Sequence, residues 1–473
     1  MPLQVKRNAQ DRVTNLRVLH VAATASGANW MVDILRGLKS RGYEASALIN
    51  GTQGDLAPEL ERNGIPYYVA DLDLFSNPLA AASKLLKLTR FLRKHRFDIV
   101  HYHLFPSVVS GRIASWLADV PLRYSMITGP LHLEASSLSK IDYRTQWMDT
   151  NVIATCEYTR KLYYMKGVQS SRIVKIYYGA DEARFNPATA ISLKLRHELG
   201  ITPLEPVVGM IAYFYAPFPK ESWAPYLQGR AIKGHETLIQ ATKKLIEKKP
   251  NVKVLLVGKG WGMDGEEYRD HLKETVKNMG LSETIIFTGH RDDIPDTLAS
   301  FNVSVQCSLS ENLGGTIESL LMARPTVATE VGGMIDSVRH EQTGLLVPPG
   351  DPESLAEAIL KLLNNPDKAR QLGQNGRQLM LREFTLDKTT DDIDDLYQSS
   401  TAKIFRQSKS AQLNLHYYSV YRTLIRFCLL IILLPCYAER SMIISSLRNL
   451  VRVILNGTYL VLQKFRLLLK IEL

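Results

Sequence analysis

The sequence predicts an α/β protein built from two similar halves, each a parallel sheet covered by helices. Apolar runs of strand length alternate with amphipathic helical segments, which is typical of parallel sheets buried on both faces. This alternation restarts after DEARFNP, residues 181–187. A chain of 473 residues also exceeds one core, because domains usually hold about 100–200 residues.

The elements of the first half begin with LRVLHVAAT, residues 16–24, whose continuous apolar character predicts a buried strand. A glycine turn, SGANW, separates it from the first helix. Further strands are predicted over 43–50, 65–72, 98–105, 122–128 and 151–156, and helices over 31–42, 83–96 and 110–120.

The second half opens with the strand PVVGMIAYFY, residues 206–215. Asp351 and Pro352 are a helix start signal, so a helix is expected over 351–365. The other expected strands are 252–260, 283–290, 303–308, 325–330 and 344–349, and the other expected helices are 235–248 and 316–323.

This order of elements predicts four parts of the chain. Residues 1–187 form a first domain and 188–385 a second, followed by a closing helix and linker over 386–410 and a basic apolar tail over 411–473. In open parallel sheets, ligands bind at the carboxyl ends of the strands, so we expect a site in a cleft between the two domains.

Composition excludes several classes of protein. The four cysteines (Cys156, Cys307, Cys428 and Cys436) form neither a disulfide framework nor a zinc pattern, which fits a reducing compartment. The polar N-terminus lacks the apolar core of a signal peptide. Residues 401–473 hold 11 Lys and Arg against 2 Asp and Glu, whereas the rest is nearly neutral. This distribution argues against a nucleic-acid-binding body.

The segment SENLGGTIESLLMARPTVATEVGG, residues 310–333, carries the strongest chemical signal. Gly314 and Gly315 let the backbone approach a ligand, and Thr316 opens a helix whose start favours anions. Glu318, in the first turn, can accept hydrogen bonds from sugar hydroxyls. Together these features describe a nucleotide-sugar site. The alternative is helix capping, with Gly315 as N-cap and Glu318 favoured by the dipole.

With TGLLVPPGDPESLAEAI after it, this segment resembles the C-terminal domain of retaining GT-B glycosyltransferases of family 4. That family includes bacterial enzymes that glycosylate polysaccharides and lipids. The resemblance extends from about residue 16 to 400. It implies two Rossmann-like domains facing a cleft, and transfer of a sugar from a nucleotide diphosphate donor to a hydroxyl acceptor. No cofactor and no metal are expected.

The resemblance also implies roles for residues of the second domain. Glu318 matches the glutamate that holds the ribose, and Glu311 the one near the donor sugar. The family spaces these glutamates eight apart, but here they are seven apart, and Ser310 occupies the strict position. IKGHETLI supplies Lys233 as the phosphate-binding lysine, and Arg230 replaces a missing arginine from an insertion, 216–231. Both would neutralise the leaving diphosphate, or else form a solvated pair beside a loop.

In the first half, the loop GPLHLE carries His132, which by resemblance faces the donor sugar or the acceptor, with Glu134 orienting its ring. The alternative is a loop histidine satisfied by packing. Gly27 in SGANW would let backbone approach the acceptor or the diphosphate. His101 and His103 share one face of a strand end, so His103 either reaches the cleft or packs in the core.

The tail predicts attachment to a membrane surface. Its longest uncharged run, Phe427–Ala438, would rise about 18 Å as a helix, short of the ~30 Å hydrocarbon core. Arg422 and Arg426, and Arg448 and Arg452, share helical faces, as in a helix lying on anionic lipid. The alternatives are docking on the protein's own surface, or a re-entrant or spanning segment.

These features together place the protein in the cytoplasm, peripheral on the inner face of the cell membrane, with a polysaccharide or lipid-linked acceptor. Two other functions remain open at this point. One is a sugar-phosphate synthase or phosphorylase of the same fold, and the other is a non-catalytic sugar-binding or membrane scaffold protein.

Overall fold

The computed structural model describes residues 15–75, 78–220 and 224–410. The tail that is predicted to bind membranes lies outside these residues. Among these residues, those up to 116 and those from 120 to 400 belong to one compact unit, and residues 117–119 and 401–410 belong to a second. Within the described ranges, no helix is both long and apolar enough to cross a bilayer.

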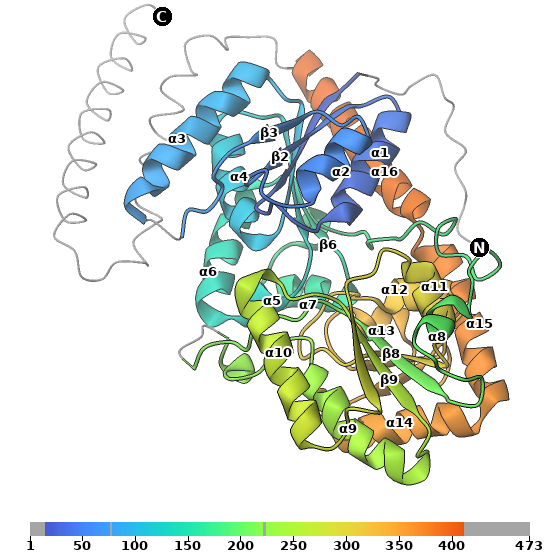
Figure 1. The fold of residues 1–473 in the computed structure, drawn as a ribbon. Coiled ribbons are helices and arrows are strands. Elements are labelled where there is room, and N and C mark those ends of the chain that lie inside the picture. The colour runs from blue at the N-terminus through green and yellow to red at the C-terminus, as the bar shows by residue number, and fades with distance from the viewer. Residues whose placement is uncertain (1–14, 76–77, 221–223, 411–473) are drawn as a thin grey trace, which may run out of the picture. The chain divides into compact units, whose positions relative to one another are not determined.

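The first domain contains a seven-stranded parallel sheet in the order β3-β2-β1-β4-β5-β6-β7 (Figure 1). Its strands are β1 (Arg17–Ala22), β2 (Glu44–Ile49), β3 (Tyr67–Val69), β4 (Ile99–His103), β5 (Leu122–Ile127), β6 (Asn151–Ala154) and β7 (Ile173–Lys175). Its helices are α1 (Asn29–Ser40), α2 (Leu56–Arg62), α3 (Pro78–His95), α4 (Phe105–Leu117), α5 (Leu131–Glu134), α6 (Ser136–Thr145) and α7 (Glu157–Met165), with short 3₁₀ turns η2 (Gln146–Met148) and η3 (Ser170–Arg172).

The second domain contains a six-stranded parallel sheet in the order β10-β9-β8-β11-β12-β13. Its strands are β8 (Val207–Ile211), β9 (Lys253–Val257), β10 (Ile285–Gly289), β11 (Val303–Gln306), β12 (Thr326–Thr329) and β13 (Leu345–Val347). Its helices are α8 (Lys194–Glu198), α9 (His235–Lys248), α10 (Gly262–Asn278), α11 (Ile294–Ala299), α12 (Thr316–Leu321), α13 (Met334–Ser337), α14 (Pro352–Asn364) and α15 (Pro366–Glu383), with the 3₁₀ turn η4 (Pro225–Leu227).

Both sheets reverse their strand order at one place, between β1 and β4 in the first and between β8 and β11 in the second. Ligands of open α/β sheets bind outside the carboxyl ends of the strands at such a point. The fold therefore directs attention to the loops that follow β1, β4, β8 and β11.

The predicted α/β fold with two parallel sheets is confirmed, with shifts at element ends. Helix α4 begins at Phe105 rather than near residue 110, because Leu104 takes a positive φ of 65° that ends β4 in a tight turn. Strand β8 ends at Ile211, earlier than predicted, although Phe214 still donates to Lys259 O at 3.0 Å. The predicted cap of α14 is present, since the Asp351 side chain accepts from the backbone N–H of Glu353 and Ser354.

The last helix, α16 (Leu386–Ser410), lies beside α1 of the first domain (Figure 1). A Cβ added at Gly37 would lie 2.7 Å from Thr390 Oγ1, so the glycine permits this approach. The Arg41 guanidinium pairs with Asp391 at 2.6 Å, and the Tyr43 hydroxyl donates to Asp394 at 2.6 Å. The chain thus returns to the first domain after completing the second.

Candidate active site

The loop between β11 and α12 carries the predicted glycine pair and both glutamates. Gly314 has a positive φ of 53°, which side chains rarely adopt, and Gly315 is the N-cap of α12. A Cβ at Gly315 would lie 2.7 Å from Gln306 Nε2. The glycines are therefore required by conformation and by space. The structure also agrees with the simple capping alternative, so the glycines by themselves do not indicate a ligand site.

Lys233 and Glu311 form a largely buried ion pair in this loop region, with 21% and 15% of their side chains exposed. Glu311 also accepts from the backbone N–H of Asn312 at 3.1 Å. Burial alone would lower the pKa of Lys233, but the charge of Glu311 and the neighbouring Tyr215 hold that pKa above its usual value. At neutral pH the site therefore contains a fixed ammonium group.

The position of Lys233 follows from Gly234, the N-cap of α9. Gly234 has a positive φ of 72°, and a Cβ there would lie 2.1 Å from Cys307 O. The glycine thus lets the start of α9 pack directly on the end of β11. The ammonium also lies 5.8 Å from the centre of the Tyr215 ring, within cation–π range.

Glu318 has an unpartnered atom in the site. Its Oε2 is buried and has no hydrogen-bond partner among the described residues. Burial raises the pKa of Glu318, and the charge of Arg184 opposes this shift. Buried polar atoms are almost always hydrogen-bonded in folded proteins. An unpartnered carboxylate oxygen beside the Glu311 loop is therefore a candidate ligand contact.

Three loops meet around Glu311: its own loop, the loop that contains Gly332 and Gly333, and the loop that begins at Pro130. A Cβ at Gly332 would lie 1.7 Å from Glu311 O and 3.4 Å from Pro130 Cγ, so the second glycine pair allows close packing here. A Cβ at Gly333 would lie 2.6 Å from the Cβ of Cys156, so no side chain fits at this position either. The structure thus brings the loop that begins at Pro130, in the first domain, to the predicted donor site.

His132 lies on α5, the short helix that begins directly after Pro130. Its ring stacks on Phe105 with centroids 4.6 Å apart, and only 8% of the residue is exposed. Burial lowers the pKa of His132 to about 4, so the ring is neutral near pH 7. Its Nε2 has no hydrogen-bond partner in the described part of the chain. This buried, unpartnered nitrogen is a candidate ligand contact.

The prediction that Glu134 orients the His132 ring is wrong. Glu134 Oε2 instead accepts from Ser310 Oγ at 2.8 Å and from the Tyr226 hydroxyl. These contacts join the first domain to the second, and to the insertion that precedes Lys233. Ser310 thus stands at the position where the family has a glutamate, and its hydroxyl binds a carboxylate of the other domain.

Two predicted residues, Arg230 and Gly27, contact parts of the chain other than Lys233 and Glu311. Arg230 is exposed, and its guanidinium lies against Gly350, after β13, where a Cβ would be 2.1 Å from Nη2. In the described ranges no hydrogen bond or ion pair joins the Arg230 side chain to Lys233 or Glu311. A role for Arg230 at the leaving diphosphate therefore stays a prediction.

Gly27 has a positive φ of 67° and donates its N–H to Asp55 at 2.7 Å. A Cβ at Gly27 would lie 3.4 Å from the Trp261 ring of the second domain. A cavity of about 710 Å³ opens beside it, lined from the first domain by Ser26 and Asp55 and from the second by Tyr213 and Trp261. The loop after β1 thus borders a cavity large enough for a sugar.

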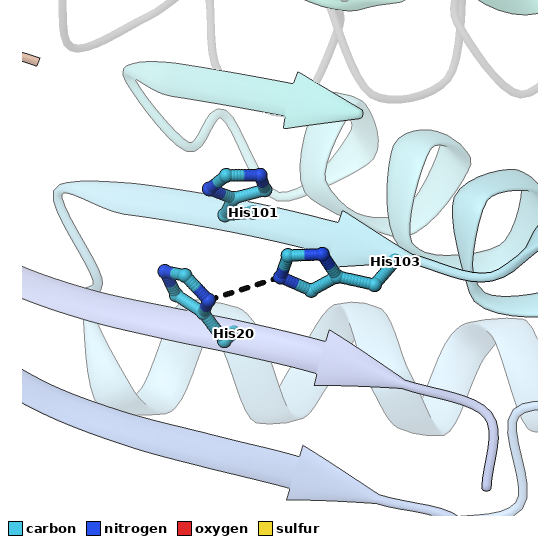
Figure 2. A group of neighbouring side chains, drawn as sticks. All are labelled: His20, His101 and His103. Carbon is cyan, nitrogen blue, oxygen red and sulfur yellow. Dashed lines mark hydrogen bonds between the residues drawn. The ribbon is translucent and has the colours of Figure 1, made fainter. Parts of the chain in front are cut away.

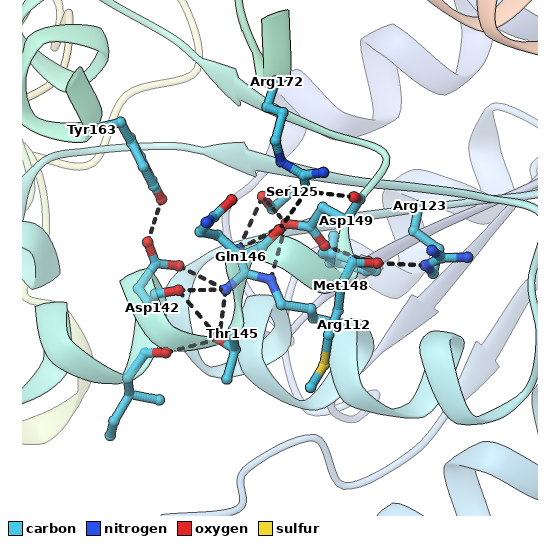
Figure 3. Close-up of polar contacts among 12 residues, drawn as sticks. Arg112, Arg123, Ser125, Asp142, Thr145, Gln146, Met148, Asp149, Tyr163 and Arg172 are labelled. Atoms are coloured by element: carbon cyan, nitrogen blue, oxygen red, sulfur yellow. Dashed lines mark hydrogen bonds and ion pairs between the residues drawn. The ribbon is translucent and has the colours of Figure 1, made fainter. Parts of the chain in front are cut away.

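A buried polar network supports the segment that carries His132 (Figure 3). The Arg112 guanidinium donates to Asp149 at 2.9 Å, to Asp142 at 3.0 Å and to Ser125 at 3.2 Å. Arg112 and both aspartates have no exposed side-chain surface. One cation thus ties α4 to β5 and to α6, the helix that follows α5.

Two family models match the chain. "Glycosyl transferases group 1" matches residues 228–379, which include Lys233, Glu311 and Glu318. "Glycosyl transferase 4-like domain" matches residues 27–179, which include Gly27 and His132. Together they cover more than half of the sequence and every strand except β1 and β8.

Curated relatives and solved structures agree with these matches. A D-inositol 3-phosphate glycosyltransferase of Acidothermus cellulolyticus is 25% identical over 80% of this chain and 87% of its own length. The UDP-Gal:alpha-D-GlcNAc-diphosphoundecaprenol alpha-1,3-galactosyltransferase of Escherichia coli is 24% identical over 74% of this chain and 88% of its own. The crystal structure of Anabaena HepE in complex with UDP-glucose aligns with a TM-score of 0.68 and 22% identity, over 81% of this chain and 100% of that one.

Proposed function

The chain belongs to the group 1 glycosyltransferases with a GT-B fold, and from this premise we propose a specific reaction. It transfers a sugar from a nucleoside diphosphate donor to a hydroxyl acceptor, with retention of the anomeric configuration. The observation that carries the proposal is the grouping of Lys233, Glu311 and Glu318 at the carboxyl ends of β8 and β11.

Glu318 supports the donor half of this proposal. A carboxylate that accepts from two vicinal hydroxyls is a natural partner for ribose, and Glu318 Oε2 has no other partner in the described residues. Gly314 and Gly315 have no side chain to keep a diphosphate from the backbone of the same loop. The nucleoside and the diphosphate would then bind to adjacent parts of one loop.

Lys233 supports the chemical half. When a diphosphate enters, the ammonium donates to a phosphoryl oxygen and stabilises the charge that develops on the leaving group. Glu311, which pairs with Lys233 in the free protein, then turns to the hydroxyls of the donor sugar. The acceptor oxygen bonds to the anomeric carbon on the face from which the diphosphate departs. The acceptor proton passes to the departing phosphate.

The acceptor is proposed to be a hydroxyl of a growing polysaccharide or of a lipid-linked sugar. The name of the Escherichia coli relative, whose acceptor is linked to diphosphoundecaprenol, supports the lipid-linked form. The unpartnered Nε2 of His132 is proposed to contact the donor sugar or this acceptor. The reaction would then serve cell-envelope polysaccharide or glycolipid synthesis.

Attachment to the inner face of the cell membrane is the second part of the proposal. It rests on the sequence of residues 411–473, which hold 8 Lys and Arg against 2 Asp and Glu around an apolar run. Deleting 411–473 should release the protein from membranes but spare activity on a short soluble acceptor. If the full chain expressed in its own host stays in the soluble fraction, this part of the proposal fails.

A nucleotide screen tests the donor part directly. UDP, GDP and ADP are each added to the purified full chain, and its melting temperature is measured. A nucleotide at 100 times its Kd stabilises the folded state by about 2.7 kcal/mol, which raises the melting temperature by several degrees. One nucleotide should do so. If none of the three shifts the transition, the proposed donor site is contradicted.

A further inference from the structure

Three histidines meet in the middle of the first sheet, below the loop that carries Gly27. His20 lies on β1 directly opposite His101 on β4, and His103 follows two residues later on the same face. The ring centroids are 4.5 Å apart for His20 and His101, 4.5 Å for His101 and His103, and 5.0 Å for His20 and His103 (Figure 2). All three side chains are fully buried.

Two tyrosine hydroxyls lie against one nitrogen of each ring. The Tyr397 hydroxyl of α16 is 2.6 Å from His101 Nδ1 and 3.3 Å from His20 Nε2. The Tyr178 hydroxyl is 3.3 Å from His103 Nδ1. The other three nitrogens are His20 Nδ1, His101 Nε2 and His103 Nε2.

These remaining nitrogens are the ones a metal ion would use. His20 Nδ1 and His103 Nε2 are 3.0 Å apart. Two nitrogens bound to a tetrahedral zinc at 2.0–2.1 Å are separated by about 3.3 Å, so a small adjustment would suffice. One nitrogen from each of the three rings lies within 4.8 Å of the other two. His101 Nε2 has no hydrogen-bond partner among the described residues.

The hydrogen bonds of the metal-free cluster do not balance. Hydrogen bonds link Tyr178, His103, His20, Tyr397 and His101 in that order, and they leave His101 Nε2 without a partner among the described residues. Each nitrogen of a neutral imidazole carries either an N–H or a lone pair, so His101 Nε2 keeps one or the other unused. Either way one buried atom stays unsatisfied, at a cost of about 1–3 kcal/mol.

A bound metal ion removes this imbalance. With His20 Nδ1, His101 Nε2 and His103 Nε2 as ligands, the opposite nitrogen of every ring carries its hydrogen. Each of those N–H groups then donates to a tyrosine oxygen, two of them to Tyr397 and one to Tyr178. Partners of this kind around metal-bound histidines fix the tautomer and the orientation of the ring.

We propose that His20, His101 and His103 form a three-histidine site for a first-row transition-metal ion of the Zn²⁺ type. Three imidazoles without a carboxylate select such an ion over Mg²⁺ or Ca²⁺, which prefer oxygen ligands. Burial lowers the pKa of all three rings, that of His20 to about 3, so their lone pairs are free at neutral pH. The ion would fasten β1 and β4 to Tyr397 of α16.

The test uses the full chain, produced without a histidine tag and dialysed against a chelator. Zn²⁺ is then titrated by calorimetry, and metal content is measured after a second dialysis without chelator. One Zn²⁺ per chain should remain, and the melting temperature should rise when Zn²⁺ is added. Co²⁺ in its place should give the visible absorption of a site with three histidine ligands.

Three variants separate this site from binding at surface histidines. His101→Gln should abolish stoichiometric binding, whereas His271→Gln, at an exposed position on α10, should leave it unchanged. Tyr397→Phe keeps all three ligands and should weaken affinity about 10- to 100-fold, which is informative even if His101→Gln fails to fold. The proposal is overturned if the wild-type chain retains only sub-stoichiometric metal, or if Tyr397→Phe binds as tightly as wild type.

Discussion

Replacing Glu318 by glutamine should have opposite effects on nucleotide binding and on folding. In the free protein, Glu318 Oε2 is buried and has no partner among the described residues, and burial raises the pKa of the side chain. Glutamine keeps the shape but removes the buried charge. The variant should therefore be at least as stable as the wild type, although it loses a charged hydrogen-bond acceptor for the donor.

The size of the binding effect follows from the kind of bond that is lost. A hydrogen bond to a charged group contributes about 1.5–3 kcal/mol. A loss of 1.4 kcal/mol weakens binding tenfold, so the Kd of the nucleotide should rise about 10- to 150-fold. The melting temperature of the free variant should stay equal or increase, because burying an unpaired charge costs more than burying a neutral amide.

Calorimetry measures the Kd of the nucleotide that stabilises the wild type in the screen, and thermal melts measure the melting temperature of the free variant. Glu283→Gln is the matched control, since Glu283 is exposed just before β10. If Glu318→Gln binds nucleotide like the wild type, Glu318 is not part of the donor site. If the variant also melts several degrees lower, Glu318 is a structural residue only.

Three further predictions concern the surroundings of the site. Lys233→Met should lower turnover about 10²- to 10³-fold while changing nucleotide affinity far less, as steady-state kinetics and calorimetry on the same preparation can show; equal losses in both would assign Lys233 to ground-state binding. Arg112→Met leaves Asp142 and Asp149 buried without their cation, so urea unfolding should report a loss of about 3–5 kcal/mol, and a loss below 1 kcal/mol would contradict the network. Because the pKa of His132 falls from 6.5 to about 4 on folding, the unfolded chain binds more protons between these values. The contribution of His132 to stability is complete above pH 6.5 and should decline by about 3 kcal/mol as pH falls to 4; a His132→Phe variant with the same pH dependence would refute this.

The sequence predicted the fold well because its strands carry their own signal. Continuous apolar runs such as residues 16–24 and 252–260 became β1 and β9, since a strand covered on both faces needs no polar side. The signal for the start of α14 is also local, because Asp351 caps the helix that directly follows it. Element ends were harder, since α4 begins where Leu104 adopts a positive φ that no residue pattern indicates.

The candidate site was predictable only where the motif itself fixes the geometry. Glu311, Gly314 and Glu318 share one loop and one helix turn, so their proximity follows from spacing. The bond between Ser310 and Glu134 joins residues 176 positions apart, and neither neighbourhood indicates the other. The contact between Arg230 and Gly350 was unpredictable for the same reason, because the path of an insertion through space depends on long-range packing.

The sequence predicts no metal because no group of carboxylates in it has ligand spacing. His20 and His101 are far apart in the chain, and only the parallel register of β1 and β4 puts them opposite each other. A histidine pattern spread over two strands therefore becomes visible only once the sheet is formed.

The most direct test of the proposed function is a transfer assay with the full chain. The donors are nucleotide sugars of the nucleotide that raises the melting temperature, with a ¹³C label in the sugar. They are incubated with the enzyme and a lipid extract from the host, and the product is examined by NMR. We predict release of nucleoside diphosphate that depends on the lipid extract, and a product whose anomeric configuration equals that of the donor. Release that is independent of any acceptor, an inverted product, or no reaction with any donor that binds would contradict the account.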